Sequence, residues 1–273
     1  MISRLSLAPL SLPDLTPDVF LRTAAEAGYR RVCLRLFGGD AVRPRLLSPA
    51  LVYDPVMAVE LGRIADGEGV AVTEIEVLMI GRNSDIASCE PMLAAGAAIG
   101  AEVLTVCVVD EDIGRAADRL GALARLAGAY RIEVGLEFAP STRMRSLGEA
   151  VALRAQAGET NVAVVVDALH LTRSGGRAAD VAASCGAPLR LLQLCDAPLV
   201  APEDPADRLR EARDLRMVPG EGEIDLVSLI RAMPDGCGFS VEVPDAERVA
   251  RLGPLGHARG LREAAERLFA EVQ

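Results

Sequence analysis

Lysine and tryptophan are both missing from this sequence of 273 residues, and tyrosine occurs only three times. The 29 cationic side chains are therefore all arginine. This excludes Schiff-base chemistry through a lysine amine, as in lysine-dependent aldolases and pyridoxal enzymes. The formal net charge is −10. An acidic chain with few aromatic residues lacks the basic surface and stacking side chains that bind nucleic acid, so we expect no nucleic-acid partner.

Long apolar runs are also absent, because no stretch approaches the 18 or so residues of a membrane span. The first residues, MISRLSLAPLSLPDL, lack the basic and apolar regions of a secretory signal. We therefore expect a cytoplasmic protein with no membrane partner. The cysteines show no CxxC spacing, which favours reduced, mostly buried thiols over disulfides or a zinc knuckle. They are Cys33, Cys89, Cys107, Cys185, Cys195 and Cys237.

Short β-branched runs alternate with amphipathic Ala/Leu/Arg/Glu-rich stretches along the whole chain, which is typical of repeated βα units. No linker or low-complexity tract interrupts them, so we predict one domain, residues 1–273. The expected strands are 2–8, 30–36, 70–78, 102–108, 132–138, 162–168, 190–195 and 238–243. The expected helices are 17–27, 54–68, 86–99, 111–128, 146–157, 177–185, 224–233 and 257–271. Eight such strands predict an α/β protein with a (β/α)8 TIM barrel.

The last four expected strands each end with a polar residue, namely Glu137, Asp167, Gln193 and Glu242. In a TIM barrel the carboxyl ends of the strands build the active site, so these four side chains are expected to converge. Three carboxylates in one dry pocket need raised pKa values or a cation. We therefore predict a divalent metal site with four oxygen ligands, which suits Mn²⁺ or Mg²⁺ best and leaves Co²⁺ or Zn²⁺ open.

Two histidines and one arginine are further candidates. His170 follows Asp167 in a D-x-x-H pattern, in the turn that leaves the sixth strand, and is expected beside the metal. His257 is interpreted as a structural residue at the start of the last helix. The segment 196–223 is long for a connection and is interpreted as a substrate-covering loop, in which Arg216 either binds a substrate oxygen or is a solvated surface residue.

Together, Glu137, the DALH and QLCDAP stretches, PGEGEID and Glu242 resemble the xylose isomerase-like TIM-barrel superfamily of sugar phosphate isomerases and epimerases. The resemblance implies that Glu137, Asp167, Gln193 and Glu242 hold one catalytic divalent ion and that His170 contacts substrate. Sugar epimerases of this family usually have histidine where this chain has Gln193, and an acidic residue where it has Arg143. Glutamine at the position of Gln193 is instead similar to bacterial 3-dehydroshikimate dehydratases. Those enzymes carry a histidine close before the arginine that matches Arg216, whereas this chain has Asp214 there.

The favoured chemistry is metal-dependent isomerisation or epimerisation of an α-hydroxy carbonyl, sugar-like small molecule through an enediolate. Glu137 and Glu242 are the expected acid/base pair, and His170 and Arg216 the expected substrate-binding residues. A dehydratase acting on a substrate of the 3-dehydroshikimate or inosose type is one alternative, and a non-catalytic sugar-binding barrel is another. Homo-oligomer formation is left open by the sequence.

Overall fold

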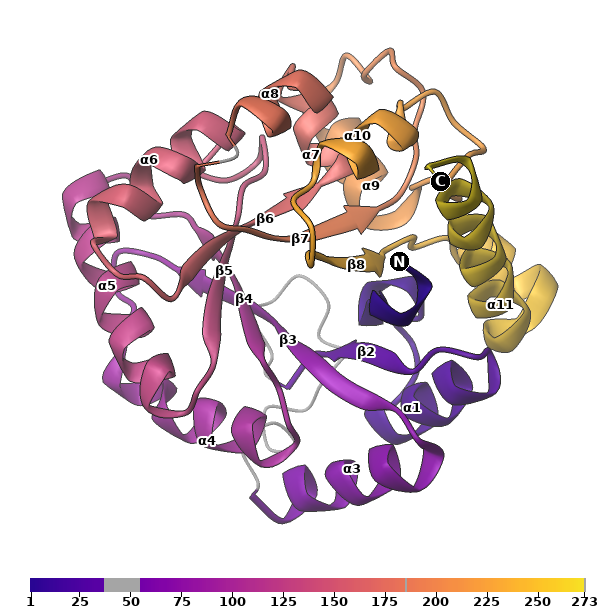
Figure 1. Cartoon of the computed structure of the whole chain (residues 1–273), viewed down its shortest axis with the longest axis horizontal. Helices are drawn as coiled ribbons and strands as arrows, with labels where there is room; N and C mark the ends of the chain where they lie inside the picture. The colour runs from indigo at the N-terminus through magenta and orange to yellow at the C-terminus, as the bar shows by residue number, and fades with distance from the viewer. Residues whose placement is uncertain (37–54, 185, 273) are drawn as a thin grey trace.

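The parallel strands close into a barrel in this computed structural model, which describes residues 1–36, 55–184 and 186–272 (Figure 1). Neighbouring strands follow chain order around the ring, and β1 pairs with β8 to close it. The prediction of a single-domain TIM barrel is therefore confirmed. The strands are β1 (Leu5–Leu7), β2 (Arg31–Leu34), β3 (Ala71–Ile80), β4 (Val103–Val108), β5 (Glu133–Glu137), β6 (Val162–Asp167), β7 (Leu189–Leu194) and β8 (Gly238–Val241).

Helices form the outer layer around the strands, as Figure 1 shows. None of the helices in the described part of the chain is both long and apolar enough to cross a membrane. The α-helices are α1 (Pro17–Glu26), α3 (Pro55–Glu68), α4 (Glu90–Ala98), α5 (Ile113–Ala129), α6 (Leu147–Ala157), α7 (Ala168–Arg173), α8 (Ala178–Ala183), α9 (Pro205–Asp214), α10 (Leu226–Ala232) and α11 (Ala246–Val272). Short 3₁₀ turns are η1 (Ile2–Arg4), η2 (Pro9–Ser11) and η3 (Ala87–Cys89).

The structure corrects some of the predicted boundaries. The first strand does not begin at residue 2, because η1 precedes β1. The last helix starts at Ala246 rather than at 257, and Gly253, which has a φ of 72°, interrupts it before Pro254. The first residue of the predicted helix 54–68 lies outside the described residues.

Two helices appear where loops were expected. The helix α9 lies within the predicted loop 196–223. Its sequence PADRLREARD has no apolar face to reveal it, although Asp204 caps its first turn and Pro205 opens it. The helix α7 replaces the predicted turn after β6.

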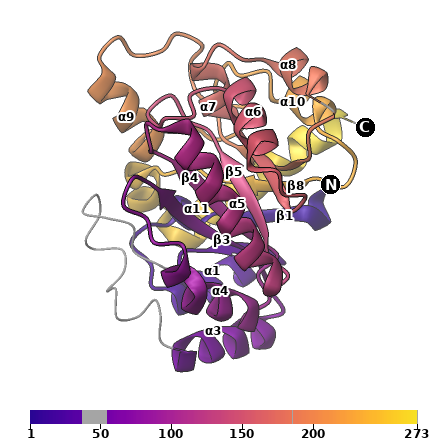
Figure 2. The same cartoon turned by 90° about the vertical axis from the view of Figure 1, so that its left-hand side faces the viewer.

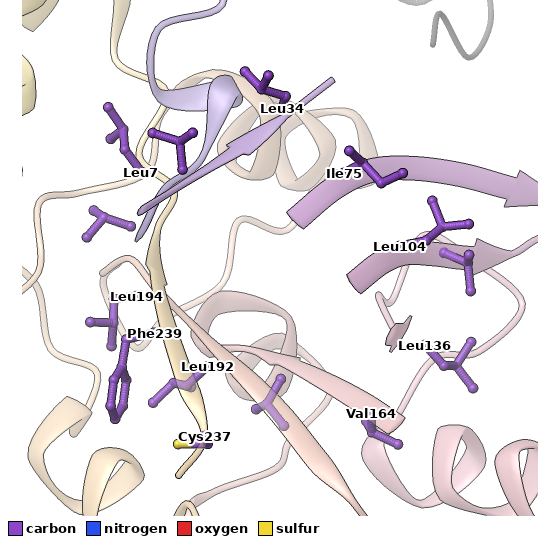
Figure 3. Close-up of a cluster of buried hydrophobic side chains, with 14 of the residues drawn as sticks. Leu7, Leu34, Ile75, Leu104, Leu136, Val164, Leu192, Leu194, Cys237 and Phe239 are labelled. Atoms are coloured by element: carbon purple, nitrogen blue, oxygen red, sulfur yellow. The ribbon is translucent and has the colours of Figure 1, made fainter. Parts of the chain in front are cut away.

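The apolar core lies between the strands and the helices. Figure 3 shows that every strand contributes to this layer through labelled residues such as Leu136 and Leu192. Phe239 of β8 meets Phe269 of α11 there, with ring centroids 4.9 Å apart. Because successive strand residues point to opposite faces, the neighbours of these outward side chains point into the barrel. The polar residues of the strands are thereby directed to the barrel interior.

The cysteines that the structure describes are free thiols, and Cys89 is the only one of them that is not fully buried. The others are Cys33, Cys107, Cys195 and Cys237. The prediction of reduced, mostly buried cysteines is confirmed for these residues. Cys185 lies outside the described residues.

Candidate functional site

The four polar residues predicted as metal ligands lie at the carboxyl ends of β5 to β8. Glu137 ends β5, Asp167 ends β6, and Gln193 is the register partner of Asp167 on β7. Glu242 lies one residue beyond β8 rather than inside it, and its backbone N–H donates to the Leu194 carbonyl at 3.1 Å. All four are buried, with at most 8% of each residue exposed.

Two of these residues, Glu137 and Asp167, form a cluster with His170. One potential ligand atom from each lies within 4.8 Å of the others. Asp167 caps α7, since its Oδ1 accepts the His170 backbone N–H at 2.8 Å. The first turn of this helix then brings His170 Nε2 to 3.9 Å from Glu137 Oε1. The D-x-x-H spacing thus places Asp167 at the N-cap of α7 and His170 in the first turn of that helix.

Arg216 also reaches this cluster, from the segment between β7 and β8. Its guanidinium nitrogen Nη1 lies 2.5 Å from Asp167 Oδ2 and 2.9 Å from Glu242 Oε2. Its Nε donates to the Ala212 carbonyl at 2.7 Å. Only 4% of the residue is exposed, so the alternative of a solvated surface arginine is wrong.

Asp196 fixes the chain that carries Arg216. Its Oδ1 accepts the backbone N–H of Ala197 at 2.9 Å and that of Ile224 at 3.0 Å, while its Oδ2 accepts that of Gly220 at 2.9 Å. Its backbone also pairs with Met217 through two hydrogen bonds of 2.9 Å. A carboxylate that accepts several backbone amides is compensated for its burial. The polar residue in QLCDAP thus anchors the segment next to Arg216.

The acidities of these groups differ because their neighbours differ. Burial raises the pKa of Glu137 well above its usual value, and the nearby carboxyl groups of Glu242 and Asp167 raise it further. Burial also acts on Asp167, but the positive charge of Arg216 and the hydrogen bond from His170 hold the pKa of Asp167 below its usual value. Burial lowers the pKa of the His170 imidazole, so the ring is neutral at pH 7.

Glu242 and Arg216 respond to the same burial in different ways. Burial raises the pKa of Glu242, and Arg216 only partly offsets this. Burial acts to lower the pKa of Arg216, but Asp167 and Glu242 more than compensate and raise it. The site therefore combines the fixed positive charge of Arg216 with carboxyl groups of unequal acidity. Unequal acidity of this kind is what acid/base chemistry requires.

Gln193 supplies the observation that tests whether a metal ion fits. Its side-chain Oε1 is fully buried and has no hydrogen-bond partner among the described residues. A buried oxygen without a partner costs about 1 to 3 kcal/mol, and a cation would satisfy it. Its register partner Asp167, together with Glu137 and Glu242 at the same ends of their strands, offers further oxygen donors of the kind that bind Mn²⁺ or Mg²⁺. The residues present fit a divalent ion.

Residues that the sequence interpretation missed lie on the opposite wall of the barrel. Arg35 Nη2 donates to Glu76 Oε1 at 3.0 Å, and the Cys33 thiol lies 3.2 Å from Glu76 Oε2. On β4, the Cys107 thiol lies 3.6 Å from Glu137 Oε2. The two glutamates two residues apart in the strand run VTEIEVL were a signal for this wall, since residues at that spacing share one face of a strand.

A cavity of about 200 Å³ lies beside His170, between α7 and α9. Figure 2 shows α9 projecting from the barrel next to α7. The buried ion pair of Arg173 with Glu211, at 2.7 and 2.8 Å, forms part of the wall. The predicted covering segment therefore contributes a helix to one side of the site.

Eight parallel strands with an acidic cluster at their carboxyl ends define a TIM-barrel protein with a polar, enzyme-like site. The family model for the xylose isomerase-like TIM barrel matches residues 21–270. The chain belongs to this family, as its resemblance implied. The comparison with curated proteins gives no significant match.

Solved structures with the same fold share few identical residues with this chain. An IOLI protein with a bound zinc atom is 18% identical, with a TM-score of 0.76 over 98% of this chain and 97% of that one. D-psicose 3-epimerase from Clostridium cellulolyticum H10, determined with D-tagatose, is 15% identical, with a TM-score of 0.76 over 99% of each chain.

A probable 3-DHS dehydratase, AsbF from Bacillus anthracis, is 14% identical, with a TM-score of 0.71 over 97% of this chain and 98% of that one. A xylose isomerase-like TIM barrel/4-hydroxyphenylpyruvate dioxygenase fusion protein is 20% identical, with a TM-score of 0.74. There the match covers 98% of this chain but only 44% of the longer protein. Epimerases and a dehydratase thus share this barrel.

Proposed function

We propose that this protein is a divalent-metal-dependent isomerase or epimerase that acts on a sugar-like α-hydroxy carbonyl compound. The observation that carries the proposal is the buried Oε1 of Gln193, which has no partner among the described residues and belongs to a strand in register with Asp167. Glu137, Asp167, Gln193 and Glu242 would hold the ion, with Mn²⁺ or Mg²⁺ preferred and Co²⁺ or Zn²⁺ as alternatives. The positive charge of the ion would stabilise the enediolate formed when the substrate loses a proton.

The residues of the chain would perform the proton transfers. Glu137, whose carboxyl group lies 3.9 Å from the His170 ring, would remove the proton from the carbon next to the carbonyl. The neutral His170 ring, 3.9 Å from Glu137, can hydrogen-bond a substrate oxygen. Glu242 would return a proton to the opposite face. Return to the other face of the same carbon gives an epimer, and return to the neighbouring carbon gives a carbonyl shift.

A dehydratase is the second candidate, and one contact favours it. Glu242 is engaged by Arg216 at 2.9 Å, whereas the Glu137 carboxyl has no arginine within ion-pair distance in the described residues. One acid/base residue is sufficient for elimination, because Glu137 would take the proton from carbon and then give it to the β-hydroxyl group, which leaves the enolate as water. Structural neighbours of both reaction types support keeping both candidates.

The proposed enolisation can be tested directly by solvent exchange. The protein is incubated in D₂O with Mn²⁺ and a panel of ketohexoses, inososes and 3-dehydroshikimate. Deuterium incorporation at the carbon next to the carbonyl is then measured by NMR after the Mn²⁺ has been removed. Epimerised or isomerised products support the first proposal, and loss of water supports the second.

A matched pair of variants connects the exchange to the site. Glu137→Gln should abolish exchange, because the amide is not a base. Glu133→Gln is the control, since Glu133 lies at the other end of the same strand and pairs with Arg190 at 3.0 Å. Binding of a panel compound without any exchange would contradict the enzymatic proposal and favour a sugar-binding barrel. We also keep a cytoplasmic location as a prediction.

A further inference from the structure

The guanidinium group of Arg216 lies where it competes with a divalent ion. Two of the four proposed ligands, Asp167 and Glu242, point a carboxylate oxygen at its Nη1, at 2.5 and 2.9 Å. Only 3% of the Arg216 side chain is exposed. Among the described residues, the remaining two ligand groups, Glu137 and Gln193, form no hydrogen bond or ion pair with it. The Arg216 guanidinium is thus a cation that the chain itself brings to two of the proposed ligands.

We infer that Arg216 is the counterion of the metal-free site and that it weakens binding of the divalent ion. This inference rests on the proposed metal site. Its physical basis is that the guanidinium occupies carboxylate lone pairs that the ion would use, and that a buried positive charge repels a second one strongly. Metal binding therefore requires Nη1 to withdraw from at least one of Asp167 and Glu242.

The surrounding contacts restrict this movement to the end of the side chain. The backbone of Met217, the next residue, forms two hydrogen bonds with Asp196, and the Asp196 carboxylate holds Gly220 and Ile224. These bonds fix the chain on one side of Arg216. The end of α9 lies on the other side, at Asp214. The exchange is then a displacement of the guanidinium, while the backbone at Met217 stays in place.

The metal affinity of variants tests the inference without any activity assay. Mn²⁺ is titrated calorimetrically into chelator-treated protein at about pH 8, with all variants measured at the same pH. Arg216→Met should bind Mn²⁺ at least about tenfold more tightly than wild type, equivalent to about 1.4 kcal/mol. Arg216→Lys keeps the charge, so its affinity should stay nearer to that of wild type. Arg173→Met removes another buried, ion-paired arginine and should leave the affinity unchanged.

Each outcome separates the inference from the proposed function. Unchanged or weaker Mn²⁺ binding by Arg216→Met, with normal binding by wild type, overturns the inference and leaves the metal site standing. Absence of binding in both proteins overturns the metal site, and the inference with it. If Arg173→Met also bound Mn²⁺ more tightly, the cause would be the general loss of positive charge rather than displacement of the Arg216 guanidinium. That result would also overturn the inference.

A measurement on the wild-type protein covers the case in which Arg216→Met does not fold. The Nε–H resonance of Arg216 is assigned by its loss from the NMR spectrum of Arg216→Lys. Mg²⁺ should shift this resonance as the guanidinium leaves a carboxylate, while the amide resonance of Met217 moves much less. An Nε–H resonance that does not shift at saturating Mg²⁺ would overturn the inference.

Discussion

The unpartnered oxygen of Gln193 leads to a prediction in which stability and metal binding move in opposite directions. In Gln193→Leu, a side chain of similar size replaces the buried amide, whose register partners are Asp167 on β6 and Ser240 on β8. The buried Oε1 costs about 1 to 3 kcal/mol in the metal-free protein, so its removal should stabilise that form by about this amount. In a domain of this size, each kcal/mol raises Tm by about 2 to 4 °C.

Metal binding by the same variant should weaken. One of four oxygen ligands is lost, and we expect Mn²⁺ affinity to fall by about tenfold or more, because even groups that only orient metal ligands change affinity by about 10 to 100-fold. The assay combines thermal unfolding of chelator-treated protein with calorimetric Mn²⁺ titration. Gln156→Leu, the same substitution at an exposed position of α6, is the control and should change neither quantity.

The result that refutes this reasoning is specific. A Gln193→Leu protein with wild-type Mn²⁺ affinity would show that Gln193 is not a ligand. A protein with lower thermal stability in the metal-free form would show that the side chain makes stabilising hydrogen bonds.

Two further predictions concern Glu242 and Glu74. Turnover by Glu242→Gln should fall by about 100-fold or more, because the amide cannot transfer a proton. The assay compares its initial rate with that of Glu247→Gln, a control at an exposed position. A wild-type rate in Glu242→Gln would show that Glu242 takes no part in the mechanism. Burial raises the pKa of Glu74 to about 7, so the folded state holds this proton more tightly than the unfolded state does. The resulting contribution to the free energy of unfolding is complete below about pH 4.5 and is lost as the pH rises through 7. Glu74→Gln should therefore gain up to roughly 3 kcal/mol over wild type at about pH 8 and little at about pH 4; equal gains in denaturant unfolding at both would contradict this.

The pattern of residues along the chain was sufficient to predict the barrel. The strands are buried on both faces and appear as short β-branched runs, whereas apolar residues recur every three or four positions in the helices, and both patterns are written directly in the sequence. Strand alternation also placed Glu137 and Gln193 on the inner face, as neighbours of the outward Leu136 and Leu192. The same periodicity missed α9, because a polar helix at the rim buries too little apolar surface to leave a stripe.

The contacts that give the site its charge were decided by the tertiary structure alone. Arg216 is 49 positions from Asp167 in the chain, and Arg35 is 41 positions from Glu76. No local pattern states which of 29 arginines neutralises which carboxylate, since that depends on barrel closure and on the path of the segment that Asp196 anchors. The sequence determined which side chains face the interior, because alternation is a property of neighbouring residues. The fold determined which charges meet there, because electrostatic attraction depends on distance in space.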